Sequence, residues 1–96
     1  MNSKTYNVIA SILMDKDYSF NHDKPVIIPF QFIEGRLISG YVSILKEDFQ
    51  VKKIIAKVQF LSDELLGDLS VGSTFQMFDG KSFSGHGQIE EIIGWQ

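Results

Sequence analysis

The sequence has no cysteine, only two prolines and no long apolar run in its 96 residues, and each absence excludes a class of protein. Without cysteine the chain forms neither disulfides nor thiolate metal sites. Its apolar runs are far shorter than the roughly 18 residues that a membrane-spanning helix needs. The first ten residues, MNSKTYNVIA, lack the apolar core of a signal peptide. We therefore expect a cytoplasmic protein of bacterial type that does not enter a membrane.

Positive charge is scarce as well. The chain has nine lysine and arginine residues and twelve aspartate and glutamate residues, which gives a net charge of −3. Affinity for a nucleic-acid backbone depends on basic residues that neutralise phosphates, so this balance argues against general binding to nucleic acid. Acidic residues intersperse the five lysines that would have to form any small basic surface, namely Lys46, Lys52, Lys53, Lys57 and Lys81.

Apolar residues are plentiful, at 44% of the chain, and eight phenylalanines outnumber the three tyrosines and one tryptophan. This composition predicts a single domain, residues 1–96, with a core built on phenylalanine. The clearest strand covers residues 54–60, because apolar side chains alternate there with a period of two. That period places one apolar face of the strand in the core, made of Ile54, Ala56, Val58 and Phe60.

The remaining patterns predict further strands and hardly any helix. We expect strands at residues 6–14, 25–32, 37–45, 74–78 and 81–93, and one short helical turn at residues 62–69. Six strands separated by regular turn signals predict an all-β protein, a small closed six-stranded β-barrel of the Greek-key type. The predicted core consists of Val8 or Ile9, Ile12, Val42, Ile44, Ile54, Val58, Phe60, Phe75, Met77, Phe83 and Ile89.

Prolines and glycines mark the irregular places in these strands. Pro25 and Pro29 cannot donate ladder hydrogen bonds, so we expect residues 25–32 to form an edge strand or an irregular one. Gly40, inside the strand at residues 37–45, predicts a β-bulge.

The last third of the chain predicts a sharply bent hairpin. Asp79-Gly80 suits the two central positions of a type I′ turn, which both need positive φ. Gly85 and Gly87 follow within the next strand, where glycine marks a bulge, a corner or a close backbone approach. Together these residues predict a hairpin that bends around a small barrel.

This region also resembles a known family. Residues 69–75, 78–81 and 85–89 are similar to the end of the C-terminal barrel of elongation factor Tu, and residues 29–32 (PFQF) echo its Pro-Gln-aromatic motif. Only Lys81 stands at a place equivalent to a basic residue of the family. The resemblance implies a stand-alone barrel, because the chain lacks the phosphate-binding G-x-x-x-x-G-K-[ST] loop of the GTPase domain. The resemblance implies a barrel and not a translation role. The family's barrel helps to hold aminoacyl-tRNA and an exchange factor, and by that analogy alone an RNA- or tRNA-associated module is an alternative function.

One segment looks superficially like a metal site. Residues 15–23 carry oxygen-bearing side chains at every second position, as the first half of a calcium loop does. However, Phe20 stands where that loop needs glycine, and Val26 stands where it needs a bidentate glutamate. We therefore expect a solvated acidic loop and no metal site.

No group of residues points to catalysis either. His22 and His86 have no evident partner to tune them as general bases. Glu90 and Glu91 are adjacent, so they point to opposite faces of a regular strand and cannot share one site. We therefore expect no catalytic residue, no cofactor and no small-molecule substrate.

Two aromatic residues in polar segments, Phe20 and Phe49, either cap the barrel ends or form an apolar patch for a partner. Together with Pro29 and Phe30 of the expected edge strand, and with Lys81, they are the predicted contact residues. We accordingly expect a non-enzymatic domain that binds another protein. The RNA-associated module stays open as an alternative, and so does a small enzyme, which would reveal itself by a pocket holding His86 beside a carboxylate.

Overall fold

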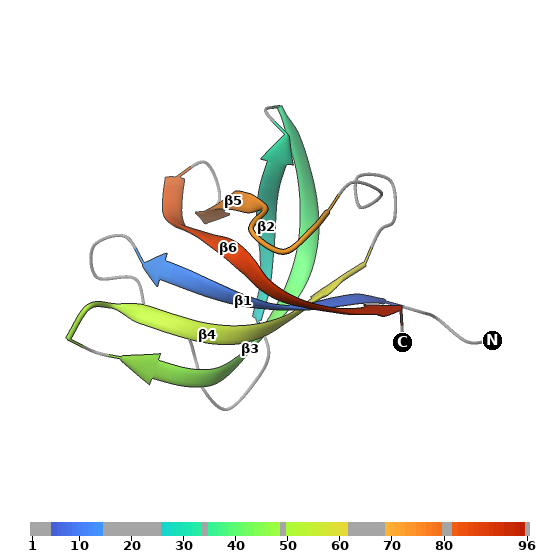
Figure 1. The fold of residues 1–96 in the computed structure, drawn as a ribbon. Helices are drawn as coiled ribbons and strands as arrows, with labels where there is room; N and C mark the ends of the chain where they lie inside the picture. The colour runs from blue at the N-terminus through green and yellow to red at the C-terminus, as the bar shows by residue number, and fades with distance from the viewer. Residues whose placement is uncertain are drawn as a thin grey trace.

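The computed structural model describes residues 5–14, 26–33, 35–48, 50–61, 69–79 and 82–95. These residues form six strands that close into one barrel in the order β1-β4-β3-β2-β5-β6, with every neighbouring pair antiparallel (Figure 1). The strands are β1 (Tyr6–Met14), β2 (Val26–Ile33), β3 (Arg36–Asp48), β4 (Lys53–Phe60), β5 (Thr74–Asp79) and β6 (Ser82–Trp95).

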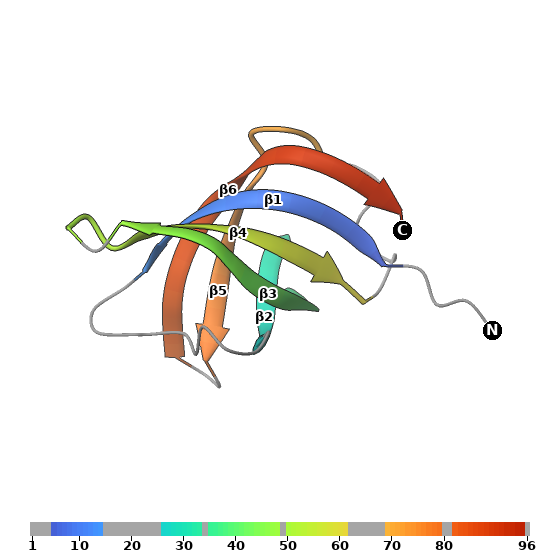
Figure 2. The same ribbon diagram turned by 90° about the horizontal axis from the view of Figure 1, so that it is seen from below.

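The predicted fold class is thereby confirmed, including its Greek-key order. Strands β2, β3 and β4 follow one another as neighbours, and β1 returns to lie beside β4. Beyond the barrel wall the β3–β4 hairpin projects outward, which both views show (Figures 1 and 2). The predicted helical turn at residues 62–69 lies outside the described residues, apart from Leu69, and no helix occurs in the described part of the chain.

The barrel core is built on phenylalanine, as the composition predicted. The ring of Phe30 meets those of Phe60 and Phe75 edge-on, with centroids 5.3 Å and 5.2 Å away. Phe32 lies against the same two rings at 5.5 Å and 5.4 Å. Aromatic pairs in this geometry add to the stability that burial of their area already supplies. Residues of strands β2, β4 and β5 are thus joined inside the barrel by one aromatic cluster.

The predicted core is largely confirmed. In β1 it is Val8 and not Ile9 that faces inward, Ile44 is only partly buried, and the side chain of Phe83 lies outside the described ones. The sequence prediction did not include several residues that the structure buries: Ala10, Ile28, Phe30 and Ile38. The alternation predicted for residues 54–60 is confirmed, since all four residues of its apolar face are buried.

Gly40 has a different role from the predicted one. A Cβ at this position would lie 2.9 Å from Val58 Cγ1 and 3.1 Å from Phe30 Cε1, so the glycine makes room for the core side chains. The bulge of β3 lies five residues later, where Ile44 pairs with Ala56 and the next pair is Lys46 with Ile55. Leu45 is therefore the extra residue of β3 in the ladder with β4.

Strand β2 is irregular, as predicted, but it is not an edge strand. It pairs with β3 on one side and with β5 on the other. Among the described residues the pairing with β5 is short, consisting of Phe30 with Met77 and Gln31 with Gln76. Pro29 lies just outside these two pairs, so its missing N–H removes no bond from the β2–β5 ladder.

The glycines of β6 bring its backbone close to β1, as the sequence predicted. A Cβ at Gly85 would lie 2.9 Å from the carbonyl oxygen of Leu13, and one at Gly87 would overlap the carbonyl oxygen of Ser11. The turn before β6 is displaced from its predicted position. Asp79 pairs with Ser82, so residues 80–81 connect the strands and Asp79 is not a central turn residue.

The alternation of β4 is tested by substituting two neighbouring residues that face opposite ways. Phe60 is buried and Leu61 is about half exposed. We expect Phe60→Ala to lower the free energy of unfolding by about 3–5 kcal/mol, because it removes a buried ring and leaves a cavity. Leu61→Ala, the matched control, should change it by less than about 0.5 kcal/mol. Urea unfolding of both variants measures the difference, and equal effects would contradict the assigned register.

Candidate partner-binding surface

The structure describes only two of the predicted contact residues. Phe20, Phe49 and Lys81 lie outside the described residues. Pro29 is partly exposed and lies on the outer face of β2. The structure corrects the placement of Phe30, whose side chain is fully buried in the aromatic cluster and so is no part of the surface. The reason is the strand period, which turns neighbouring side chains to opposite faces.

A group of apolar side chains nevertheless covers the outer face of strands β2 and β3. Ile27 and Leu37 are 53% and 56% exposed, and Leu61, just after β4, is 47% exposed. Tyr41 and Pro29, both partly exposed, lie among them. We call this surface the apolar patch, and it consists of Ile27, Pro29, Leu37, Tyr41 and Leu61.

Strand pairing brings the members of the apolar patch together. Ile27 pairs with Tyr41, and Pro29 pairs with Ser39. On the other side of β3, the backbone N–H of Leu61 donates a hydrogen bond of 3.2 Å to the carbonyl oxygen of Ser39. Leu37 lies two residues from Ser39 and therefore on the same face of β3. Clustered exposed apolar side chains of this kind mark sites of interaction, whereas single ones need no explanation.

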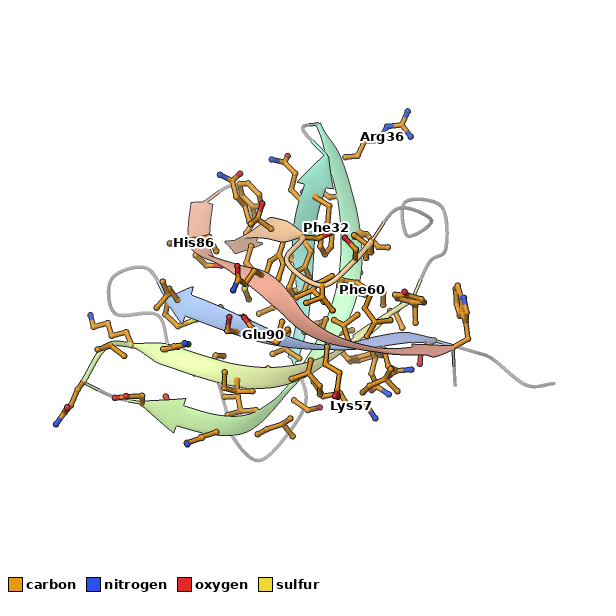
Figure 3. All side chains as sticks on the ribbon, viewed as in Figure 1. Phe32, Arg36, Lys57, Phe60, His86 and Glu90 are labelled. Atoms are coloured by element: carbon orange, nitrogen blue, oxygen red, sulfur yellow. The ribbon has the colours of Figure 1, made fainter. Side chains whose placement is uncertain are left out.

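The lysines of the described chain gather on a different part of the barrel. Lys53 and Lys57 both point outward from β4, and between them lies Ile55, the partner of Lys46 in β3. Figure 3 shows Lys57 on the side of the barrel away from His86. Acidic residues are mixed in, since Lys53 pairs with Asp48. The result is a small basic surface on β3 and β4 that the sequence alone could only suggest.

Glu90 takes part in the clearest polar contact of the outer barrel wall. In the ladder of β1 with β6, Ala10 pairs with Ile89 and Ile9 pairs with Glu91, so Glu90 is the extra residue of a β-bulge. Its Oε2 accepts hydrogen bonds from the Ser11 hydroxyl at 2.7 Å and from Gln88 Nε2 at 2.8 Å. These bonds, that from Ser11 foremost, lower the pKa of Glu90 below its ordinary value. Desolvation raises this pKa by less than the two bonds lower it, and the charge of Lys53 adds the smallest of the lowering effects.

This arrangement is poorly suited to nucleophilic catalysis. A general base works best when its pKa lies near the operating pH, and the lowered pKa of Glu90 moves it in the opposite direction. Ser11 is also largely buried, with only 8% of its surface exposed. The cluster therefore ties β6 to β1 at the bulge.

The remaining polar candidates form no metal site among the described residues. No group of three or more histidine, aspartate or glutamate side chains that could hold a metal lies among the described residues, and residues 15–23, the calcium-like segment, are outside them. No described helix is long and apolar enough to cross a membrane. His86 is exposed on β6, where it pairs with Gln76 and with Leu13.

Comparison with known proteins assigns no family to this barrel. No family model matches the chain, and no curated protein and no solved structure matches it.

The hydrogen bond from Ser11 to Glu90 has a measurable effect on titration. We expect Ser11→Ala to raise the pKa of Glu90 toward its ordinary value, and by more than Gln88→Ala, because the bond from Ser11 contributes most. Since the folded-state pKa is lowered, the stability from these bonds is present above the ordinary glutamate pKa. It is lost as the pH falls through the lowered pKa. Carboxyl NMR titration measures both shifts, and an unchanged pKa in Ser11→Ala would contradict the assignment.

Proposed function

We propose that this chain is a non-enzymatic β-barrel module that binds another protein through the apolar patch. The observation that carries the proposal is the grouping of Ile27, Leu37 and Leu61 on one outer face, each about half exposed. The barrel supplies a rigid support, because the inward neighbours of these residues are held in the core. Ile28 and Ile38, which flank Ile27 and Leu37 in sequence, are almost fully buried.

The chemistry of the patch favours a protein partner over a nucleic acid. Its members are uncharged, and three of them are aliphatic side chains. Protein surfaces that bind single-stranded nucleic acid provide cations for the phosphates and exposed aromatic side chains on which the bases stack. Protein partners instead bury apolar side chains and place polar groups at the rim. Arg36, next to Leu37 at the end of the β2–β3 hairpin, is a charged residue of that rim (Figure 3).

Substitution of the apolar patch tests this function. We expect the double variant Ile27→Ser and Leu37→Ser to capture at least fivefold less of the partner in a pull-down from the native cell. Leu45→Ser, which alters a residue 58% exposed on the projecting β3–β4 hairpin, serves as the matched control and should capture as much as wild type. Thermal melting should show little loss of stability in either protein, because exposed substitutions are usually nearly neutral. Equal capture by all three proteins would overturn the proposal.

The basic surface on β3 and β4 favours a second function, an RNA-associated module. It agrees with the sequence resemblance to the barrel of elongation factor Tu, and it rests on the grouping of Lys46, Lys53 and Lys57. This function predicts that a single-stranded RNA binds with an affinity that falls steeply as salt rises. Lys53→Gln with Lys57→Gln should then weaken binding and flatten the salt dependence in fluorescence anisotropy. Binding that is absent at low salt would exclude this second function.

A further inference from the structure

A surface cavity of about 330 Å³ borders the apolar patch across strand β2. It is formed by side chains of β2, β5 and β6, and Figure 3 shows two of them, Phe32 and His86. Gln31 joins the two surfaces, because it lies two residues from Pro29 on the same outer face of β2. We call this cavity the amide pocket, and its lining residues are Gln31, Phe32, Thr74, Phe75, Gln76 and His86.

Three strands place one row of polar side chains along the amide pocket. Gln31 pairs with Gln76, and Gln76 in turn pairs with His86. Paired residues of adjacent strands point to the same face, with strands spaced by about 4.8 Å. The row is therefore a fixed feature of the barrel wall, although Gln31 and Gln76 are 45 residues apart in the sequence.

A chain of hydrogen bonds fixes the direction in which these amides point. The backbone N–H of Gly35 can only donate, and it donates to Gln31 Oε1 at 3.2 Å. The amide nitrogen of Gln31 must then face the other way, where it donates to Gln76 Oε1 at 3.2 Å. The chain ends at Gln76 Nε2, whose two N–H groups are turned away from Gln31. The pocket therefore presents hydrogen-bond donors whose orientation is set by a backbone group.

The lining of the amide pocket selects the chemistry of its ligand. Oriented N–H groups call for an acceptor, and the hydroxyl of Thr74 is a further donor on the rim. None of the described lining residues is a lysine, arginine, aspartate or glutamate, so the described part of the pocket favours an uncharged ligand. The partly exposed Phe32 adds apolar surface beside these donors. An uncharged carbonyl oxygen on a partly apolar chain fits this combination.

We propose that the amide pocket binds a peptide carbonyl of the protein partner, next to apolar side chains that cover Ile27 and Leu37. This inference rests on the proposed function, because it takes the apolar patch to be the adjoining contact. The partner is then an extended segment that presents apolar side chains to the patch. One of its main-chain carbonyls accepts a hydrogen bond from Gln76 Nε2.

N-methylacetamide, the smallest molecule with a peptide group, probes the pocket without any partner. Titrated into the ¹⁵N-labelled chain, it should cause saturable shifts of the amide signals of Thr74, Gln76 and His86 and of the Gln31 side-chain amide. Gln76→Glu keeps an acceptor for Gln31 and removes the donors, and it should weaken the apparent affinity at least fivefold. Gln50→Glu, which introduces the same charge at an exposed turn residue, should bind as wild type does.

Three results would overturn the inference. The first is a linear response at the pocket that matches other surface amides. The second is equal affinity in Gln76→Glu and wild type. The third is tighter binding of sodium acetate than of N-methylacetamide, which would show that the ligand is anionic. None of these results affects the pull-down with the Ile27 and Leu37 variant. Failure of the pocket and failure of the proposed function are therefore told apart.

Discussion

The structure depends on the packing of Phe30 at the junction of β2 and β5. Among the described residues only two pairs join these strands, so the described backbone ladder contributes little to closing the barrel there. The ring of Phe30 reaches across the junction to Phe75 and also contacts Phe60, and Phe32 repeats both contacts. Gly40 opens the space that the ring fills. Burial of aromatic side chains thus closes the barrel where the described strand pairing is shortest.

That closure explains why function-related groups occur where they do. Because Phe30 and Ile28 face inward, Ile27, Pro29 and Gln31 must face outward from the same strand. The outer side of β2 consequently carries apolar residues at one end and an amide at the other. Its neighbour β3 places Tyr41 beside Ile27 and places Leu37 nearer to Gln31, and β5 adds Gln76 beside Gln31. The choice of which β2 side chains face inward therefore determines both the apolar patch and the amide pocket.

The sequence predicted where the strands of this fold lie better than it predicted which of their side chains face the core. Residues 54–60 alternate between apolar and polar, so both the strand and its buried face followed from the pattern. Gly85 and Gly87 likewise indicated a close backbone approach, which the structure shows between β6 and β1. The run PVIIPFQF is apolar on both faces, so its pattern does not show which face is buried. For this reason the sequence could not show that Ile27 is exposed and Phe30 is buried.

Positions that depend on register could not be predicted at all. The bulges at Leu45 and Glu90 arise from how two strands pair, and neither residue is of a type that marks a bulge. The contact of Glu90 with Ser11 joins residues 79 positions apart, and it exists only because the bulge adjusts the pairing. The amide pocket has the same origin, since a row from Gln31 to His86 requires three strands to be aligned. Residues whose position depends on strand register could therefore not be named as site residues from the sequence.

The short pairing between β2 and β5 has a consequence for how the molecule moves. Proteins open locally in cooperative units, and an opening begins where few hydrogen bonds must break. In this barrel β1 is paired along nearly its whole length on both sides, while β2 and β5 share two pairs of described residues. The barrel wall should therefore part first between β2 and β5 and remain a continuous curved sheet elsewhere. Native-state hydrogen exchange would detect this fluctuation as early deuterium uptake by the β2–β5 amides.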